Sequence, residues 1–225
     1  MTAQILAQKN QIFKIKFSLT DREFSQFLEK YGNVPIPPYI KTIAPKQKLK
    51  KWYQTVFAQK EGAVAGPTAG FHFTNRLINK LKKKGIKIAF LTLHISWGTF
   101  APIKTKEIEK HKMHPEWYQI PQRVFQKIKK TKAENKRVIA VGTTVCRALE
   151  SAFSCKPPKL SGWTRLYIKP GYKFKVVDAV ITNFHLPKTS LLVLVSAFAG
   201  RRKILAAYRE AVKRKYRFIV LAMQC

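Results

Sequence analysis

Two spacings of apolar side chains occur along the chain, and each predicts a different kind of element. Residues 11–17 place apolar side chains and lysines in turn, which predicts a strand with one wet face. Asp21 is expected to cap a helix whose apolar residues recur at helical spacing, and Gly32 is expected to end it. The chain therefore opens with a strand followed by a short amphipathic helix.

From residue 61 onward, strand and helix patterns alternate. Apolar runs predict strands near residues 63–65, 86–95, 138–141, 166–168, 176–182 and 218–222. Apolar residues at helical spacing predict helices at 74–85, from Pro121 onward, at 144–153, at 190–199 and at 202–214. Such alternation, with nearly continuous apolar strands, predicts an α/β fold with a mostly parallel sheet covered by helices.

Histidines, threonines and an asparagine follow the ends of four predicted strands. The pairs are Thr68 with His72, His94 with Thr99, Thr143 with Thr144, and Asn183 with His185. The carboxyl ends of parallel strands meet at one edge of a sheet, where ligands bind beside open helix N-termini. We therefore expect these residues to line one pocket. The alternative for residues 66–72 is an ordinary connection rich in glycine and proline, with His72 as a core residue.

The segment HKMHPEWYQIP, residues 111–121, adds a further candidate for proton transfer. His114 stands two residues before Glu116, and a carboxylate beside an imidazole fixes its tautomer and raises its pKa, as in an acid–base pair. The alternative is a surface histidine near a carboxylate at a rim. No thiol or second carboxylate accompanies His111, His114 and Glu116, so the sequence predicts no metal site.

The balance of charge narrows the class of partner. The formal net charge is +33, from 44 lysines and arginines against 11 aspartates and glutamates. This excess predicts a polyanionic partner such as nucleic acid. Most of the basic residues are lysines, which suit phosphate backbones better than base edges. The alternative is a lysine-rich surface that is simply solvated.

Cysteine usage and hydropathy indicate the compartment. The 3 cysteines show neither CxxC spacing nor an even framework, so the sequence predicts neither a zinc site nor a disulfide scaffold. The longest apolar stretch, residues 191–199, is too short for a membrane span, and no signal-peptide pattern opens the chain. We expect a cytoplasmic protein without a membrane partner.

Several strings, in this order, resemble one family, the S-adenosylmethionine:tRNA ribosyltransferase-isomerases of queuosine biosynthesis. They are PTAGFHFT (67–74), TLHISWGTFAPI (92–103), HKMHPEWYQIP (111–121), VIAVGTTVCRALES (138–151), GWTRLYIKPGYKFKVVDAVITNFHLPKTSLLVLVSAFAG (162–200) and ILAAYREAVKRKYRF (204–218). The likeness covers about nine tenths of the chain, and no common superfold shares these strings.

The resemblance implies an unusual reaction with S-adenosylmethionine as co-substrate. Its ribosyl moiety is transferred and isomerised onto 7-aminomethyl-7-deazaguanine at the wobble position of tRNA. The product is epoxyqueuosine, and adenine and methionine leave. The positive sulfonium acidifies the neighbouring ribose carbon, so a base is needed there, together with donors for the departing purine. The resemblance favours a monomer.

The resemblance also implies roles for the clustered polar residues. His72, His94, His114 and His185 are the candidates for base and acid, with a preference for His114 beside Glu116 and for His185 beside Asn183. The residues expected to shape the co-substrate pocket are Thr68, Gly70, Thr99, Gly142, Thr143, Thr144, Arg147 and Asn183. Arg147 has an alternative role as the ion-pair partner of Glu150, three residues along the same helix.

The start of the chain resembles a different part of the family's proteins than the rest of the chain does. Residues 1–20 resemble the last strands of the family's antiparallel β-barrel domain, so we expect a barrel remnant there and an α/β catalytic domain at 21–225. The family's N-terminal segment has no counterpart in this sequence. The alternative function is therefore a catalytically impaired, basic tRNA-binding remnant of the family.

Overall fold

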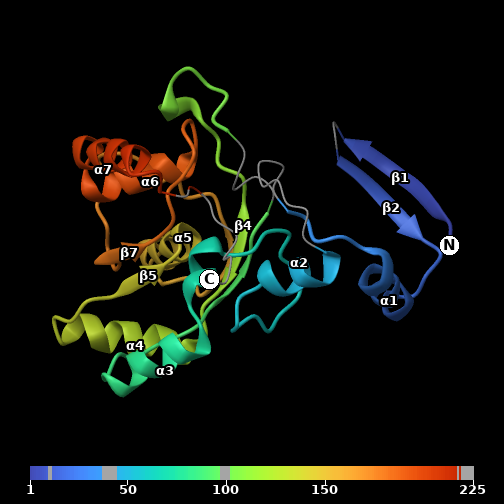
Figure 1. Ribbon diagram of the computed structural model, residues 1–225, viewed down its shortest axis with the longest axis horizontal. Helices are drawn as coiled ribbons and strands as arrows, with labels where there is room; N and C mark the ends of the chain where they lie inside the picture. Colours follow the sequence, from blue (N-terminus) through green and yellow to red (C-terminus); the bar gives the residue numbers. More distant parts are fainter. Residues whose placement is uncertain (10–11, 37–44, 97–101, 217, 219–225) are drawn as a thin grey trace.

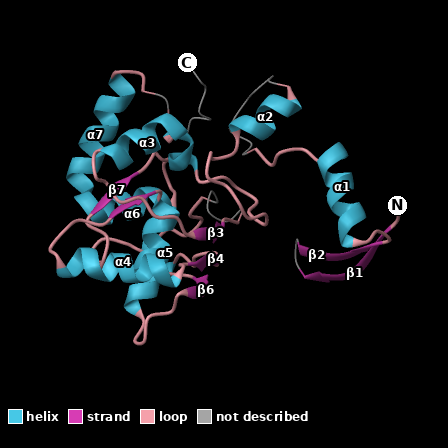
Figure 2. Cartoon of the chain, turned by 90° about the horizontal axis from the view of Figure 1, so that it is seen from below, coloured by secondary structure: helices cyan, strands magenta, loops and turns pink. Residues whose placement is uncertain are grey.

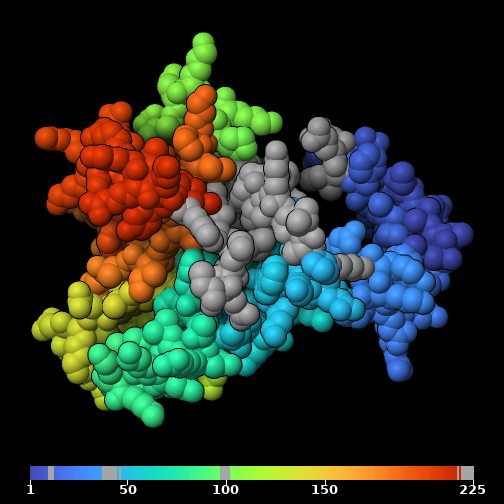
Figure 3. All heavy atoms as spheres, viewed as in Figure 1, coloured from blue at the N-terminus to red at the C-terminus, as the bar shows by residue number. Residues whose placement is uncertain are grey.

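The computed structural model describes residues 1–9, 12–36, 45–96, 102–216 and 218 (Figure 1). An antiparallel hairpin of β1 (Ala3–Lys9) and β2 (Ile12–Phe17) opens the chain. Helix α1 (Asp21–Tyr31) packs on it, with the rings of Phe17 and Phe24 stacked 4.7 Å apart. Every residue of β1 is exposed. The hairpin and α1 lie together at one end of the molecule, with α2 as the nearest other helix (Figures 1 and 3).

The caps of α1 differ from the expected ones. Thr20, not Asp21, is the N-cap: its side chain accepts from the N–H of Glu23, whose carboxylate accepts from the N–H of Thr20 in return. Gly32 ends the helix in an extended conformation with φ of −61°, not in the left-handed one. A Cβ there would lie 2.5 Å from the carbonyl oxygen of Leu28, so glycine is required by close approach.

A short connecting region joins this part to the α/β body. Helix α2 (Lys46–Trp52) is tied to α1 by an ion pair of 2.7 Å between Lys50 and Glu29. The 3-10 helix η1 (Thr68–His72) follows, and its Phe71 packs edge-on against Tyr53 with ring centroids 5.5 Å apart. These contacts hold the glycine-flanked corner against α2.

The body contains two small sheets, so the expected mostly parallel sheet is not confirmed. Strands β3 (Thr92–His94), β4 (Glu116–Gln119) and β6 (Ser161–Thr164) form an antiparallel sheet in the order β3-β4-β6. Strands β5 (Ile139–Val141) and β7 (Ala179–Ile181) pair in parallel. In β4 the side chains alternate between buried and half-buried, as expected for an antiparallel sheet with one uncovered face.

The helices of the body are close to the predicted ones. They are α3 (Asn75–Lys83), α4 (Gln122–Ala133), α5 (Thr143–Ser154), α6 (Ser190–Ala199) and α7 (Arg201–Lys213), with a 3-10 turn, η3 (Ile108–Lys110), in the insert. Thr74 caps α3 as expected. The core gathers around α5, where Cys146, Leu149 and Ala152 pack against Ile168 and Leu194. None of the helices in the described ranges is long and apolar enough to span a bilayer.

The strands are shorter than predicted, and one is displaced. Of the apolar run 86–95 only β3 pairs, and the run expected at 166–168 is preceded by the real strand at 161–164. Side-chain hydrophobicity reports burial, and Ile168 is buried without belonging to a strand. The strand expected at 218–222 falls outside the described residues.

Candidate functional site

A pocket forms where loops after β5 and β7 meet the corner at η1. The two parallel strands end side by side, and the N–H of Gly142 donates to the carbonyl of Ile181 at 2.9 Å. The pocket is lined by Gly66, Pro67, Thr68, Ala69, Leu93, Ile95, Gly142, Thr143, Thr144, Val145, Thr182, Asn183, His185, Leu186, Thr189 and Leu191. Six predicted site residues therefore meet here: Thr68, Gly142, Thr143, Thr144, Asn183 and His185.

One wall of the pocket is formed by the N-terminus of α5, which no side chain caps. Gly142 is the N-cap, with φ of 101° and ψ of 140°, and no side chain caps the first turn. Thr143 and Thr144 are buried beneath it. Uncapped N–H groups at the positive end of a helix dipole attract anionic or strongly accepting groups.

The opposite wall carries His185, which is buried at 5% exposure. Its Nε2 lies 3.0 Å from the Oγ1 of Thr182, and its backbone N–H donates to the hydroxyl of Tyr208 at 2.8 Å. Burial lowers the pKa of His185 from 6.5 to about 4. The imidazole is therefore neutral at pH 7 and acts as a hydrogen-bonding group there.

His72 reaches the pocket through Asn183. The Nε2 of His72 accepts from the Nδ2 of Asn183 at 3.0 Å, which requires a neutral ring. His72 itself is exposed, so it stands at the rim. The Oδ1 of Asn183 is buried and has no hydrogen-bond partner. A buried acceptor without a donor is costly unless a ligand supplies one.

Glu116 and Arg147, both predicted for the site, form an internal ion pair. The Nη1 of Arg147 lies 2.8 Å from the Oε2 of Glu116, and their side chains are 3% and 2% exposed. The Nε of Arg147 also donates to the carbonyl of Leu166 at 3.1 Å. The expected pairing of Glu116 with His114 in proton transfer does not fit this arrangement, because His114 is exposed while Glu116 lies in the interior with Arg147.

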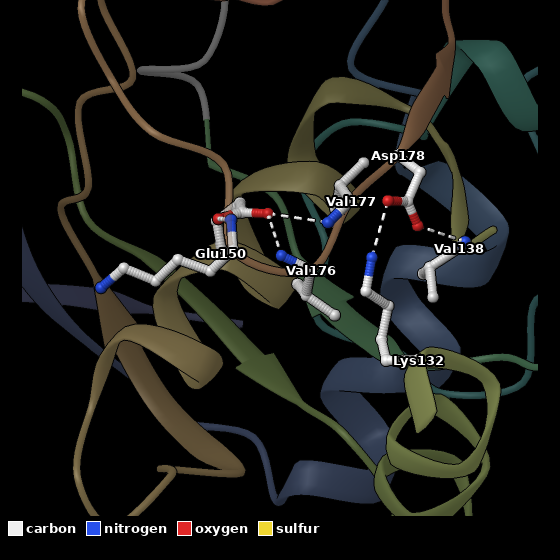
Figure 4. A network of polar contacts seen from close by, with 7 residues as sticks. Lys132, Val138, Glu150, Val176, Val177 and Asp178 are labelled. Carbon is white, nitrogen blue, oxygen red and sulfur yellow. Dashed lines mark hydrogen bonds and ion pairs between the residues drawn. The ribbon is translucent and has the colours of Figure 1, made fainter. Parts of the chain in front are cut away.

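Glu150 has a different set of partners, so the pairing of Arg147 with Glu150, the alternative to a pocket role for Arg147, does not form. Its carboxylate accepts from the backbone N–H groups of Val176 and Val177 at 3.0 and 2.9 Å (Figure 4). It also accepts from the N–H of Lys175 at 2.8 Å and from the hydroxyl of Tyr172 at 3.1 Å. Next to it, Asp178 binds Lys132 at 2.6 Å and the N–H of Val138 at 2.7 Å. These contacts join α5 and α4 to the segment that leads into β7.

Three further predicted residues do not line the pocket. His94 packs at a tilt of 51° against Trp117 with ring centroids 4.8 Å apart, because alternation along β3 turns it away from Leu93 and Ile95. His114 lies near His111, and burial and this neighbour lower the pKa of His111. Gly70 packs against Thr55 and Phe57. Thr99 lies outside the described residues.

Sequence reasoning missed two residues that shape the pocket. Thr189 caps α6 by accepting from the N–H of Leu192, and it also lines the cavity. A threonine before an apolar helical run is a readable cap signal. Tyr208 on α7 supports His185 from outside the pocket. Nothing in its local sequence marks that contact, because the two residues come together only through the fold.

Comparisons with known proteins show the family to which the chain belongs. A family model described as "Queuosine biosynthesis protein" matches residues 1–221. The chain belongs to this family. Relatives named S-adenosylmethionine:tRNA ribosyltransferase-isomerase include the Aquifex aeolicus protein, 55% identical over 91% of this chain and 60% of its own length. The Sulfurihydrogenibium protein is 56% identical over 88% of this chain and 58% of its own.

A solved structure shares the fold of this family member. The crystal structure of a Thermotoga maritima S-adenosylmethionine tRNA ribosyltransferase is 44% identical, with a TM-score of 0.55 over 68% of this chain and 48% of that one. The chain thus spans about 60% of the length of the curated relatives it matches. No group of His, Cys, Asp or Glu in the described residues is arranged to hold a metal ion.

Proposed function

We propose that the chain carries the pocket in which the ribosyl moiety of S-adenosylmethionine is transferred and isomerised onto 7-aminomethyl-7-deazaguanine of tRNA. Epoxyqueuosine forms at the wobble position, and adenine and methionine leave. The observation that carries the proposal is the meeting of residues 66–69, 142–145 and 182–186 in one pocket. These segments lie within the stretch that is 55% identical to a relative with this name.

The pocket has the mixture of surfaces that a sulfonium nucleoside needs. Leu93, Ile95 and Leu191 provide apolar walls for the purine and ribose faces. The uncapped start of α5 suits the carboxylate of the methionine part. The unpartnered Oδ1 of Asn183 suits a hydroxyl or amino donor. These residues are the ones we propose to hold the co-substrate.

Among the histidines, His72 and His185 are the proposed acid–base groups. His185 is neutral because of its burial, so its ring is in the form that accepts a proton as a base. His72 contacts Asn183 and is open to solvent, which allows it to exchange a proton. His94, His114 and Glu116 stand away from the pocket lining and are not needed in this scheme.

The proposal extends to the surroundings of the pocket. The substrate is a tRNA bearing the 7-aminomethyl precursor, and the net charge of +33 favours its phosphates. Residues 1–20 belong, in this proposal, to a β-barrel domain, and 21–225 to the catalytic domain. The protein works as a cytoplasmic monomer without a metal.

The test is release of free adenine from S-adenosylmethionine in the presence of the precursor tRNA. We expect release by the protein, loss of at least about tenfold in His72→Ala and His185→Ala, and near wild-type release in the matched variant His114→Ala. Equal loss in His114→Ala and His72→Ala would contradict the assignment. Tight tRNA binding without any adenine would instead favour the alternative function, a binding remnant.

A further inference from the structure

A row of rings crosses the three-stranded sheet on the face opposite the core. The register pairs His94 of β3 with Trp117 of β4, and Trp117 with Trp163 of β6. Glu116 and Tyr118, the neighbours of Trp117, are each 2% exposed and point into the core. Side chains alternate along a strand, so Trp117 and its two partners share the outer face. We call this set, His94, Trp117 and Trp163, the ring row.

The ring row is open to solvent at Trp163, while His94 and Trp117 are half-buried. Trp163 is 66% exposed, which is unusual for an indole. Helices α4 and α5 lie on the core side of the sheet, and in Figure 2 no described helix lies against the other side of β4 and β6. Near β3, the segment before the pocket corner closes only one end of the row, because a Cβ on Gly62 would lie 2.5 Å from the Nδ1 of His94.

The surroundings of the ring row are polar and basic. A second row runs parallel to it, formed by Thr92, Gln119 and Ser161 in register. The ammonium group of Lys60 lies on this row, 2.8 Å from the Oε1 of Gln119. Arg165, just beyond β6, is exposed. Rings bordered by hydroxyls, an amide and cations suit stacked bases with their phosphates, because the rings contact the base faces and the cations hold the backbone.

We propose that the ring row stacks unpaired bases of a single-stranded RNA segment. Rings on an open sheet face stack bases regardless of sequence, while nearby cations hold the backbone. The inference rests on the proposed function, in which the reacting nucleoside belongs to a loop whose neighbouring bases are unpaired. Strand β3 connects the two sites: Leu93 and Ile95 line the pocket, and His94 between them belongs to the ring row.

The test compares two unmodified RNAs, an anticodon stem-loop and a fully paired duplex of equal length, by binding and by tryptophan fluorescence. We expect the stem-loop to quench the indole emission and to bind more tightly than the duplex. Trp163→Ala should weaken stem-loop binding about 5- to 100-fold and leave duplex binding within about twofold. Trp163→Phe, which keeps a ring, should restore most of the affinity.

The matched control is Tyr31→Ala, which removes a ring of 57% exposure on α1 and should change neither affinity. The proposal is overturned if Trp163→Ala binds the stem-loop like the wild type, or loses equal affinity for both RNAs. It is also overturned if Trp163→Ala alters only self-association, which would make the face a protein interface. These RNAs lack the reacting amine, so the binding experiment does not depend on catalysis. Absence of adenine release from the precursor tRNA would contradict the proposed reaction and would leave the binding result unchanged.

Discussion

Arg147 and Glu116 form an ion pair of 2.8 Å between α5 and β4, with both side chains almost completely removed from solvent. Burial lowers the pKa of Arg147, and the carboxylate of Glu116 opposes that shift. The pair fastens the helix whose first turn lines the pocket to the sheet that carries the ring row. Its position between α5 and β4 suits a role in holding these two surfaces together.

Breaking this pair on one side should be strongly destabilising. Arg147→Met leaves the carboxylate of Glu116 buried without its cation, and we expect a loss of about 3–5 kcal/mol in the free energy of unfolding. The double variant Glu116→Leu/Arg147→Met should recover most of that loss. Urea unfolding with linear extrapolation measures both.

The control for this pair is an exposed one on α7. Glu210→Ala removes the exposed partner of Arg214 and should leave the free energy of unfolding nearly unchanged. A double variant as unstable as Arg147→Met would show that packing, not the loss of the cation beside Glu116, dominates at this position.

Glu150 should be more sensitive to truncation than to loss of any one donor. Its carboxylate is fully buried and accepts three backbone N–H groups and one hydroxyl. Glu150→Ala leaves the three N–H groups unpaired, and we expect it to unfold the domain or cost at least about 3 kcal/mol. Tyr172→Phe removes one donor only and should cost about 1 kcal/mol.

Thermal and urea unfolding of the two variants check this ranking. The pKa of Tyr172 also reports the contact, since burial raises it to about 12. Ultraviolet titration of the phenolate should show that Tyr172 ionises near pH 12, above the ordinary tyrosine pKa of 10.0. If Glu150→Ala were no less stable than Tyr172→Phe, the carboxylate would not hold the segment that leads into β7.

Helices could be predicted from the sequence more reliably than strands, for a physical reason. Thr74 and the periodic apolar residues after it fix α3 through local contacts alone. Strand pairing is non-local, because β4 pairs with β6 although α4, β5 and α5 lie between them in the sequence. The register of that pairing decides which side chains are buried. In the string EWYQ, tryptophan is more apolar than glutamate, yet Glu116 is the buried residue because Arg147 from another element neutralises it.

The candidate site divides in the same way. Six of the thirteen predicted site residues line the pocket. Most of them are threonines, a glycine and an asparagine, which could be recognised because breaks in the local sequence pattern mark the ends of strands. The positions of the histidines could not be predicted in this way, because they depend on the direction in which each side chain points. His94 sits one residue from two pocket residues, but strand alternation sends it to the other face. His72 reaches the pocket only through Asn183, a contact across 111 residues.

The buried imidazole of His185 predicts a loss of stability in mild acid. Its folded pKa of about 4 lies below the ordinary 6.5, so the unfolded chain binds the proton more tightly. Its contribution is complete above pH 6.5 and is lost as the pH falls toward 4, by at most about 3 kcal/mol. Chemical unfolding at several pH values across this window measures the slope.

The variant that isolates this effect is His185→Gln, which cannot take up the proton. Its unfolding free energy should fall less steeply between pH 6.5 and 4 than that of the wild type. His111, whose pKa is also lowered by burial, adds a slope common to both proteins and cancels in the difference. Identical slopes would mean that His185 is protonated in the folded protein as easily as in the unfolded one.

Gly142 offers a way to disturb the pocket wall without filling it. Its φ of 101° disfavours any side chain, while the nearest atom to an added Cβ is the Cγ2 of Val145 at 4.0 Å. Gly142→Ala should therefore cost about 1–2 kcal/mol through backbone strain alone. Because relief of that strain shifts the first turn of α5, binding of S-adenosylmethionine, measured by calorimetry, should weaken about tenfold or more.

Gly171 supplies the matched control, since it has a φ of 95° and nothing within 4 Å of an added Cβ, and it does not line the pocket. Gly171→Ala should lose similar stability but keep wild-type affinity for S-adenosylmethionine. If the two variants bound the nucleoside equally well, the first turn of α5 would not contact it. If both variants lost affinity in proportion to their loss of stability, the weaker binding would be an effect of folding. The methionine carboxylate of S-adenosylmethionine would then have to bind elsewhere in the pocket.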